Sequence, residues 1–444
     1  MRPMKLATAA FAATLAAATL AACSSSNSNS NSNPSSSSGS GSHVTLNYWA
    51  TNQGTSLQDD QSILGPQLAK FTAETGIKVN LTVLPWTTVL NQVTAATVSG
   101  KGPDVLNIGN TWSPSLQATG ALLQFTPALM SQIGGSSKFL AGSLSATGAP
   151  GKPPTAVPLY SLAYALYYNK AEFAAAGISG PPTTWAQLIA DGQKLTGNGH
   201  WGLAIEGGSV SENIHLAFEL SQQQGGEFFN SAGQPTFDTP QNVAAILQMM
   251  NFIQTDKITN PSDAQYSKGT EAQVDYATGK AAMVIWQASA GSLKLDGMNA
   301  ADIGVAPVPL PSPLPPGGKP ITSMVAGINM AIFKDTPNMS AALEFVKFMT
   351  STPEQEALNS TYGSLPTVSA AYSDPAFQTP AVDTFKSILS TSAAPMPPVP
   401  AESSFETAVG TAIIHLYADA ATGKAVTSSM IAAALTQAQQ QVAS

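Results

Sequence analysis

Residues 77–108 read IKVNLTVLPWTTVLNQVTAATVSGKGPDVLNI, and the hydrophobic pattern of this stretch decides the fold class. Apolar and polar side chains alternate over 77–83, which is typical of a β-strand. Apolar residues recur at helical spacing over 86–98, and a turn of Gly, Pro and Asp leads into a short apolar strand over 105–108. A strand, a helix and a strand in this order predict parallel strands joined by a helix that covers the sheet.

The same kind of pattern extends outward on both sides of this stretch. Before it, we expect a strand over 44–49 and a helix over 66–75 that stops at Gly76. After it, the patterns predict helices over 183–195, 241–255 and 340–350, a strand within 279–285, and a final helix from 426. Together these elements predict an α/β fold of mainly parallel sheets flanked by helices.

The N-terminal residues are typical of a secretory signal. Arg2 and Lys5 precede an uncharged apolar stretch whose Leu-Ala-Ala-Cys end, at Cys23, resembles a bacterial lipobox. We expect residues 1–22 to be removed and Cys23 to carry lipid that anchors the protein on the extracytoplasmic face of the cell membrane. An ordinary signal peptide followed by an unpaired cysteine is the alternative. Residues 23–42, almost entirely Ser, Asn and Gly, predict a disordered tether.

Composition narrows the class of ligand. The chain of 444 residues is too long for one hydrophobic core, which predicts two lobes. Arg2 is the only arginine, so the mature protein would have none. Because arginine normally binds phosphate and carboxylate groups, an uncharged ligand is favoured. The 26 acidic residues exceed the 18 basic ones, and no basic stripe indicates nucleic acid.

Several short strings in a fixed order then identify a family resemblance. They read GPDV at 102–105, LYYNK at 166–170, PPTTW at 181–185, GKAAM at 279–283, APVPL at 306–310, AGIN at 326–329 and GSLP at 363–366. In order and spacing the chain resembles the family 1 extracellular solute-binding proteins of ABC importers, a group that includes maltose-binding proteins. The resemblance covers nearly the whole mature chain.

The resemblance implies a two-lobed periplasmic-binding-protein-like fold of type II, with a ligand cleft between the lobes and a hinge that closes it. Lobe 1 would comprise 43–158 and 322–361, and lobe 2 would comprise 159–298 and 363–444. Residues 299–321, rich in Pro and Gly, would connect them. A monomer of this kind would capture a small neutral sugar and deliver it to the membrane permease of an ABC importer, without a cofactor.

Candidate ligand-binding residues lie near predicted strand ends, where rings can cover sugar C–H faces and polar groups can meet hydroxyls. From the first lobe these are Trp49, Asn52, Gln53, Trp86, Asn110, Thr111 and Trp112. The resemblance adds Tyr160, Glu206, Trp286, Gly327 and Tyr362, although the family's stacking tryptophan usually lies slightly beyond Trp286. The alternatives are that the tryptophans are buried supports and that Glu206 is a solvated loop carboxylate.

Other functions remain open at this point. A secreted carbohydrate-active enzyme would need two carboxylates flanking one bond, and Glu206 with Glu212 is the pair that we nominate. A sensor lipoprotein that presents its ligand to a receptor would use the same cleft as an importer. The adjacent Tyr167 and Tyr168 also raise the question of ferric iron, but the four histidines lack the spacing of metal ligands.

Overall fold

The computed structural model describes residues 44–287, 293 and 296–443. The predicted signal peptide, the predicted tether and Cys23 lie outside the described residues. Among the helices of the described part, none is both long enough and apolar enough to cross a membrane.

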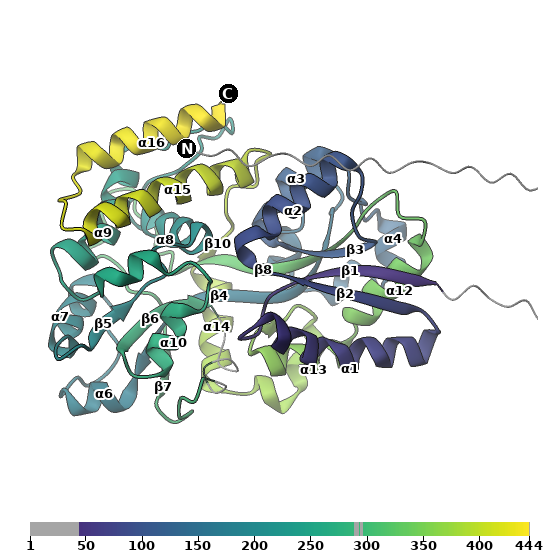
Figure 1. The fold of residues 1–444 in the computed structure, drawn as a ribbon, viewed down its shortest axis with the longest axis horizontal. Helices are drawn as coiled ribbons and strands as arrows, with labels where there is room; N and C mark the ends of the chain where they lie inside the picture. The colour runs from purple at the N-terminus through teal and green to yellow at the C-terminus, as the bar shows by residue number, and fades with distance from the viewer. Residues whose placement is uncertain (1–43, 288–292, 294–295, 444) are drawn as a thin grey trace, which may run out of the picture. The chain divides into compact units, whose positions relative to one another are not determined.

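One sheet runs through the whole described body in the order β2-β1-β3-β8-β4-β6-β5 (Figure 1). The short strands β7 and β9 pair with β4, and the short strand β10 pairs with β8. The bounds are β1 Thr45–Thr51, β2 Lys78–Leu84, β3 Val105–Gly109, β4 Val157–Asn169, β5 Trp201–Ala204, β6 Ala281–Gln287, β7 Ile303–Ala306, β8 Ser323–Ile332, β9 Leu365–Pro366 and β10 Ala393–Ala394.

The predicted βαβ unit is present, because β1 lies parallel to both β2 and β3 and helix α2 connects the latter two. Around β8 and β4, in the middle of the strand order, the sheet is mixed rather than mainly parallel. Strand β8 is antiparallel to β3 and β4, and β4 is antiparallel to β6 and β7. The prediction of mainly parallel sheets therefore holds only for the outer strands.

Strand β4 links the two halves of the molecule. Val157–Ala163 pairs with β8 in the half built on β1–β3, and Tyr164–Asn169 pairs with β6 and β7 in the other half. Its first eleven residues are all buried, as expected for a strand covered on both faces. This confirms the α/β class and gives the body two halves that meet at β4 and β8.

Helices cover both halves. Their bounds are α1 Leu57–Thr75, α2 Trp86–Ser99, α3 Ser113–Thr119, α4 Pro127–Gln132, α5 Ala141–Ser145, α6 Lys170–Ala175, α7 Trp185–Leu195, α8 Val210–Gln223, α9 Pro240–Gln254, α10 Glu271–Ala277, α12 Met339–Met349, α13 Thr352–Tyr362, α14 Pro380–Thr391, α15 Glu402–Ala421 and α16 Ser428–Ala443, with a short 3-10 turn η1 at Asn110–Trp112. In Figure 1 the pair α15 and α16 lies over α8 and α9, in the half that holds β5 and β6.

Helix α1 differs from the bounds that the sequence predicts. Helix α1 begins at Leu57, nine residues before the predicted start, because Ser56 caps it by accepting a hydrogen bond from the Asp59 amide. Pro66, which had suggested the helix start, lies inside α1. Several helices lie outside the ranges expected from the sequence, among them α8 and α15, which bring His215 and Glu406 to the candidate site.

Candidate binding site

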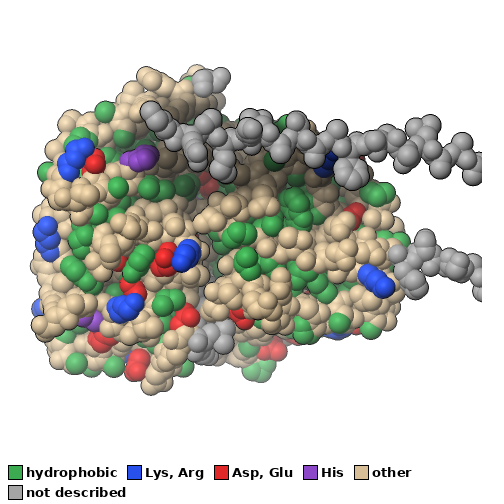
Figure 2. Space-filling model, viewed as in Figure 1, with side chains coloured by type: hydrophobic (Ala, Val, Ile, Leu, Met, Phe, Trp, Pro, Cys, Tyr) green, Lys and Arg blue, Asp and Glu red, His purple; other side chains and the backbone are tan. Residues whose placement is uncertain are grey.

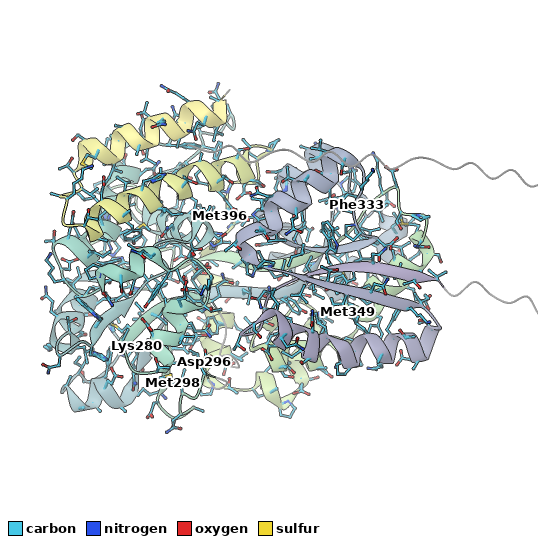
Figure 3. The ribbon with its side chains drawn as sticks, in the orientation of Figure 1. Lys280, Asp296, Met298, Phe333, Met349 and Met396 are labelled. Carbon is cyan, nitrogen blue, oxygen red and sulfur yellow. The ribbon has the colours of Figure 1, made fainter. Side chains whose placement is uncertain are left out.

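A cavity of about 330 Å³ lies where the two halves meet, beside β4 and β8. This volume is within the range of about 300–1,000 Å³ that is usual for small-molecule sites. Residues from both halves line it, and their polar side chains include those of Asn52, Gln53, Asn110, Thr111, Glu212, His215, Lys268, Gln273, Gln287, Asp296 and Glu406. Asp296, labelled in Figure 3, lies in the half that holds β6. The cavity therefore offers hydroxyl-binding groups on more than one side.

The wall from the first half consists of loops at the carboxyl ends of β1 and β3. Asn52 and Gln53 directly follow β1, and η1 directly follows β3. The Trp86 indole donates a hydrogen bond of 2.6 Å from Nε1 to the carbonyl of Asn52. The rings of Trp86 and Trp112 meet edge to face at 5.7 Å. Parallel strands bring these loops to the same edge of the sheet, which places two indoles beside several amide groups.

Buried Asp60 in α1 holds the loop after β1 in place. Its carboxylate accepts hydrogen bonds from the Asn52 side chain at 2.5 Å, from the Gln53 amide at 3.1 Å and from the Gly54 amide at 3.0 Å. All three donors line the cavity, whereas Asp60 itself does not. The start of α1 at Leu57, earlier than the sequence predicts, is what brings this carboxylate to the loop.

We expect Asp60→Asn to weaken ligand binding by about 1.5–3 kcal/mol, because the negative charge is lost and one of the two acceptor oxygens is replaced by an NH2 donor. Hydrogen exchange of the Gln53 and Gly54 amides should accelerate in this variant. Glu74→Gln, on the exposed side of the same helix, is the matched control and should leave exchange and affinity unchanged. Unaltered exchange at Gln53 and Gly54 would contradict the role of Asp60.

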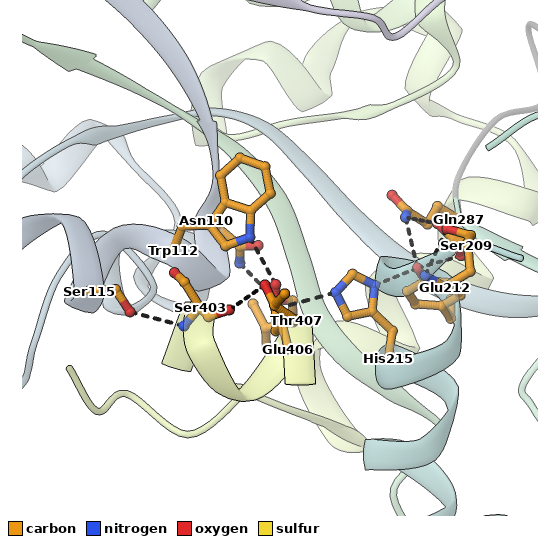
Figure 4. A network of polar contacts seen from close by, with 12 residues as sticks. Asn110, Trp112, Ser115, Ser209, Glu212, His215, Gln287, Ser403, Glu406 and Thr407 are labelled. Carbon is orange, nitrogen blue, oxygen red and sulfur yellow. Dashed lines mark hydrogen bonds and ion pairs between the residues drawn. The ribbon is translucent and has the colours of Figure 1, made fainter. Parts of the chain in front are cut away.

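The wall from the second half centres on a polar network to which Glu212, His215 and Gln287 belong (Figure 4). The Tyr164 hydroxyl lies 2.8 Å from Glu212 Oε2 and 2.8 Å from His215 Nδ1. Gln287 Nε2 donates to the same hydroxyl at 2.8 Å. Burial raises the pKa of Glu212, while the nearby His215 and the Tyr164 hydrogen bond act against this rise. The network fixes one carboxyl, one imidazole and one amide against the cavity.

Three further candidates from the resemblance also line the cavity: Trp286, Gly327 and Tyr362. The Tyr362 ring rests edge to face on Tyr160 at 5.5 Å. Gly327 lies opposite Ser161 on β4, and a Cβ there would come within 2.7 Å of the Tyr160 carbonyl oxygen. Only glycine therefore allows β8 and β4 to approach so closely at the cavity floor.

Nine of the twelve candidates thus line the cavity, and three do not: Trp49, Tyr160 and Glu206. Trp49 is half-buried and packs against the core beneath α2, and Tyr160 is buried under Tyr362. For both, the structure supports the alternative of a supporting ring.

Glu206 neither lines the main cavity nor lies exposed on a loop, which are the two alternatives from the sequence. It is not a solvated loop residue, because it is 3% exposed and accepts a hydrogen bond from the Ala272 amide at 3.0 Å. It lines a separate cavity of about 30 Å³ together with Glu212 and Trp286. Burial raises the pKa of Glu206 to about 8.

Several lining residues are not among the candidates from the sequence, chiefly His215, Gln287, Asp296 and Glu406. A signal for His215 existed, since it follows Glu212 by three residues on a helix capped by Ser209, so both side chains share one face. No such signal points to Glu406, because its contacts with Trp112 and His215 join residues that lie far apart in the sequence.

The described residues contain no group of three or more His, Cys, Asp or Glu side chains that could hold a metal ion. The tyrosine pair considered for iron does not form a site either. Tyr167 and Tyr168 are neighbours on β4, so their side chains leave opposite faces of the sheet. The Tyr167 hydroxyl donates to the Gln287 carbonyl, and the Tyr168 ring packs on Phe173.

The fold is that of an α/β protein of two halves, and a cavity lined by both halves lies at their junction. The chain belongs to the bacterial extracellular solute-binding proteins, because the model of that family matches residues 54–356. The resemblance stated from the sequence is thereby confirmed.

Individual relatives are more distant. A putative binding protein of Brucella abortus is 28% identical over 218 residues, which are 48% of this chain and 52% of that protein. The chain thus spans about half the length of this relative and of a probable ABC transporter-binding protein of Deinococcus radiodurans. The diacetylchitobiose binding protein DasA of Streptomyces coelicolor is 26% identical over 348 residues, 74% of this chain and 75% of DasA.

Among solved structures, maltose-bound MalE3 of T. maritima superposes with a TM-score of 0.77 at 22% identity. The superposition covers 90% of this chain and 99% of MalE3. At this level of identity the likeness establishes the two-lobed fold alone.

Proposed function

We propose that this chain captures a small neutral carbohydrate in the cavity and delivers it to the membrane permease of an ABC importer. The observation that carries the proposal is the lining of the cavity. Three indoles, those of Trp86, Trp112 and Trp286, accompany amide, carboxyl and hydroxyl groups from both halves. Flat apolar rings and several hydrogen-bonding groups are what a sugar requires.

The charges of the lining favour an uncharged ligand over an anionic one. Three carboxyl residues, Glu212, Asp296 and Glu406, line the cavity, and Lys268 is the one lysine among its described lining residues. A phosphate or carboxylate group would therefore meet more acidic than basic side chains. Two of the relatives carry sugars in their names, diacetylchitobiose for DasA and maltose for MalE3, which supports the same class of ligand.

The proposal includes the arrangement expected from the sequence. Lobes of 43–158 with 322–361 and of 159–298 with 363–444 would close on the ligand, with 299–321 as the connection. Lipid on Cys23 and the tether 23–42 would hold the monomer at the membrane once residues 1–22 are removed.

A hydrolase is less well supported by the site. Of the nominated pair, Glu212 lines the main cavity, but Glu206 faces only the smaller one behind Trp286. The cavity that both carboxyls line is this smaller one, and its volume of about 30 Å³ is too small for a sugar to lie between them, as a glycosidase would need. The homologues named above are described as binding proteins.

A thermal-shift screen tests the proposal. We expect the melting temperature to rise with at least one of maltose, N,N′-diacetylchitobiose, tagatose and ribitol, since a ligand at 100 times its Kd adds about 2.7 kcal/mol of stability. Sugar phosphates and sugar acids serve as anionic controls and should have no effect. Chromatography after long incubation should recover the intact disaccharide. A response confined to the anionic compounds, or to no compound, would contradict the proposal.

A further inference from the structure

Helix α15 belongs to one half of the molecule but also contacts the other. Along its length it packs against α8, α9 and α16. Its first turns also contact η1 and α3, which belong to the half built on β1–β3. The amide of Ser403 donates to Ser115 Oγ at 3.0 Å across this boundary.

Glu406, one turn further along α15, joins the two walls of the cavity (Figure 4). Its Oε2 accepts a hydrogen bond of 2.8 Å from the Trp112 indole, which comes from the first wall. Its Oε1 lies 3.6 Å from Nε2 of His215, which comes from the second wall. The carboxylate lines the cavity although Glu406 is only 2% exposed.

The surroundings of Glu406 and of its neighbour Glu402 shift the pKa values of the two carboxyls in opposite directions. Burial by itself would raise the pKa of the Glu406 carboxyl, but the neighbouring His215 and Glu402 side chains outweigh burial and lower it. Glu402, one turn earlier and fully buried, shows the opposite, because burial and the neighbouring Glu406 raise its pKa well above the usual range. Of these two neighbouring carboxyls, Glu406 is therefore the one whose charged form the surroundings favour.

We propose that Glu406 is a positioning residue that fixes the Trp112 indole and the His215 imidazole on opposite walls and so orders the binding site before the ligand arrives. From His215 the contacts continue through Tyr164 to Glu212, so one buried carboxylate sets the place of several cavity groups. A site ordered in advance loses less conformational entropy when it binds, and its affinity is higher for that reason. The effect on affinity rests on the proposed function, whereas the effect on Trp112 does not.

The first test uses the mature protein without ligand. Exchange of the Trp112 indole hydrogen is followed by NMR on nitrogen-15-labelled protein, with Trp112→Phe to assign the signal. We expect Glu406→Ala to accelerate this exchange about tenfold or more, because the charged acceptor is lost. Glu406→Gln retains an acceptor oxygen and should keep exchange slow. Ser404→Ala, at an exposed position of the same turn, is the control and should match the wild type.

The second test measures affinity for maltose and N,N′-diacetylchitobiose by calorimetry. Glu406→Ala should weaken binding about tenfold, and Glu406→Gln should recover most of this loss. In a Trp112→Phe background the further effect of Glu406→Ala should be clearly smaller, because the shared contact is already absent.

Indole exchange that stays as slow as in the wild type in both Glu406 variants would overturn the proposal. An undiminished loss of affinity of about tenfold from Glu406→Ala in the Trp112→Phe background would overturn it as well. If neither sugar binds the wild type while indole exchange follows Glu406 as expected, the sugar assignment fails and the positioning role stands.

Discussion

The melting temperature of the ligand-free protein should be higher at pH 5 than at pH 8 by at least about 5 °C. The reason is an unusual number of buried carboxyl groups. Burial raises the pKa of Glu206 to about 8 and that of Asp263 to about 7. Burial also raises the pKa values of Glu212, Glu219 and Glu402.

The direction of the effect follows from proton binding in the two states. A carboxyl of the unfolded chain releases its proton near pH 4, whereas these folded carboxyls keep theirs to a higher pH. Their contribution to the free energy of unfolding is fully present below about pH 4 and is lost as the pH rises through the folded pKa values. Glu406 acts in the opposite direction, since its lowered pKa removes stability only in stronger acid.

Glu206→Gln provides the matched control, because the amide oxygen can still accept the Ala272 hydrogen bond without an ionisable proton. We expect this variant to lose part of the difference between pH 5 and pH 8, chiefly by melting at a higher temperature at pH 8. Calorimetry across this range checks both statements. A wild-type melting temperature that rises from pH 5 to pH 8 would contradict the assignment of protonated carboxyls.

Trp286→Ala should weaken sugar binding by about 1–2 kcal/mol, a loss of roughly 5- to 30-fold in affinity. Trp286 lies on β6 opposite Ala165 of β4, and its ring lines both the main cavity and the small one behind it. Because its exposed fraction is only 7%, the truncation should also lower the melting temperature. Titration calorimetry with the sugar found in the screen, beside a melting curve, separates the two effects.

Trp201→Ala supplies the comparison for Trp286. Trp201 is a partly buried tryptophan on β5 of the same half, and it does not line the cavity. Its loss should lower the melting temperature while affinity stays near the wild-type value. If Trp286→Ala binds the sugar as tightly as Trp201→Ala does, the indole of Trp286 is not part of the ligand contact.

The sequence by itself determined the α/β class, the family and most of the wall contributed by the first half. Asn52, Gln53 and the residues of η1 were found because they follow strands, and strand ends are local features of the pattern. Parallel strands then bring those loops to one edge without further information.

Only the tertiary structure decided which side chains face the cavity and which support it. Trp49 and Trp86 look alike in sequence, yet one packs under α2 and the other lines the site, because strand register and helix packing set their directions. Glu406 meets Trp112 across 294 residues of chain. Contacts at that separation depend on how distant elements pack, and no local pattern of apolar residues encodes them.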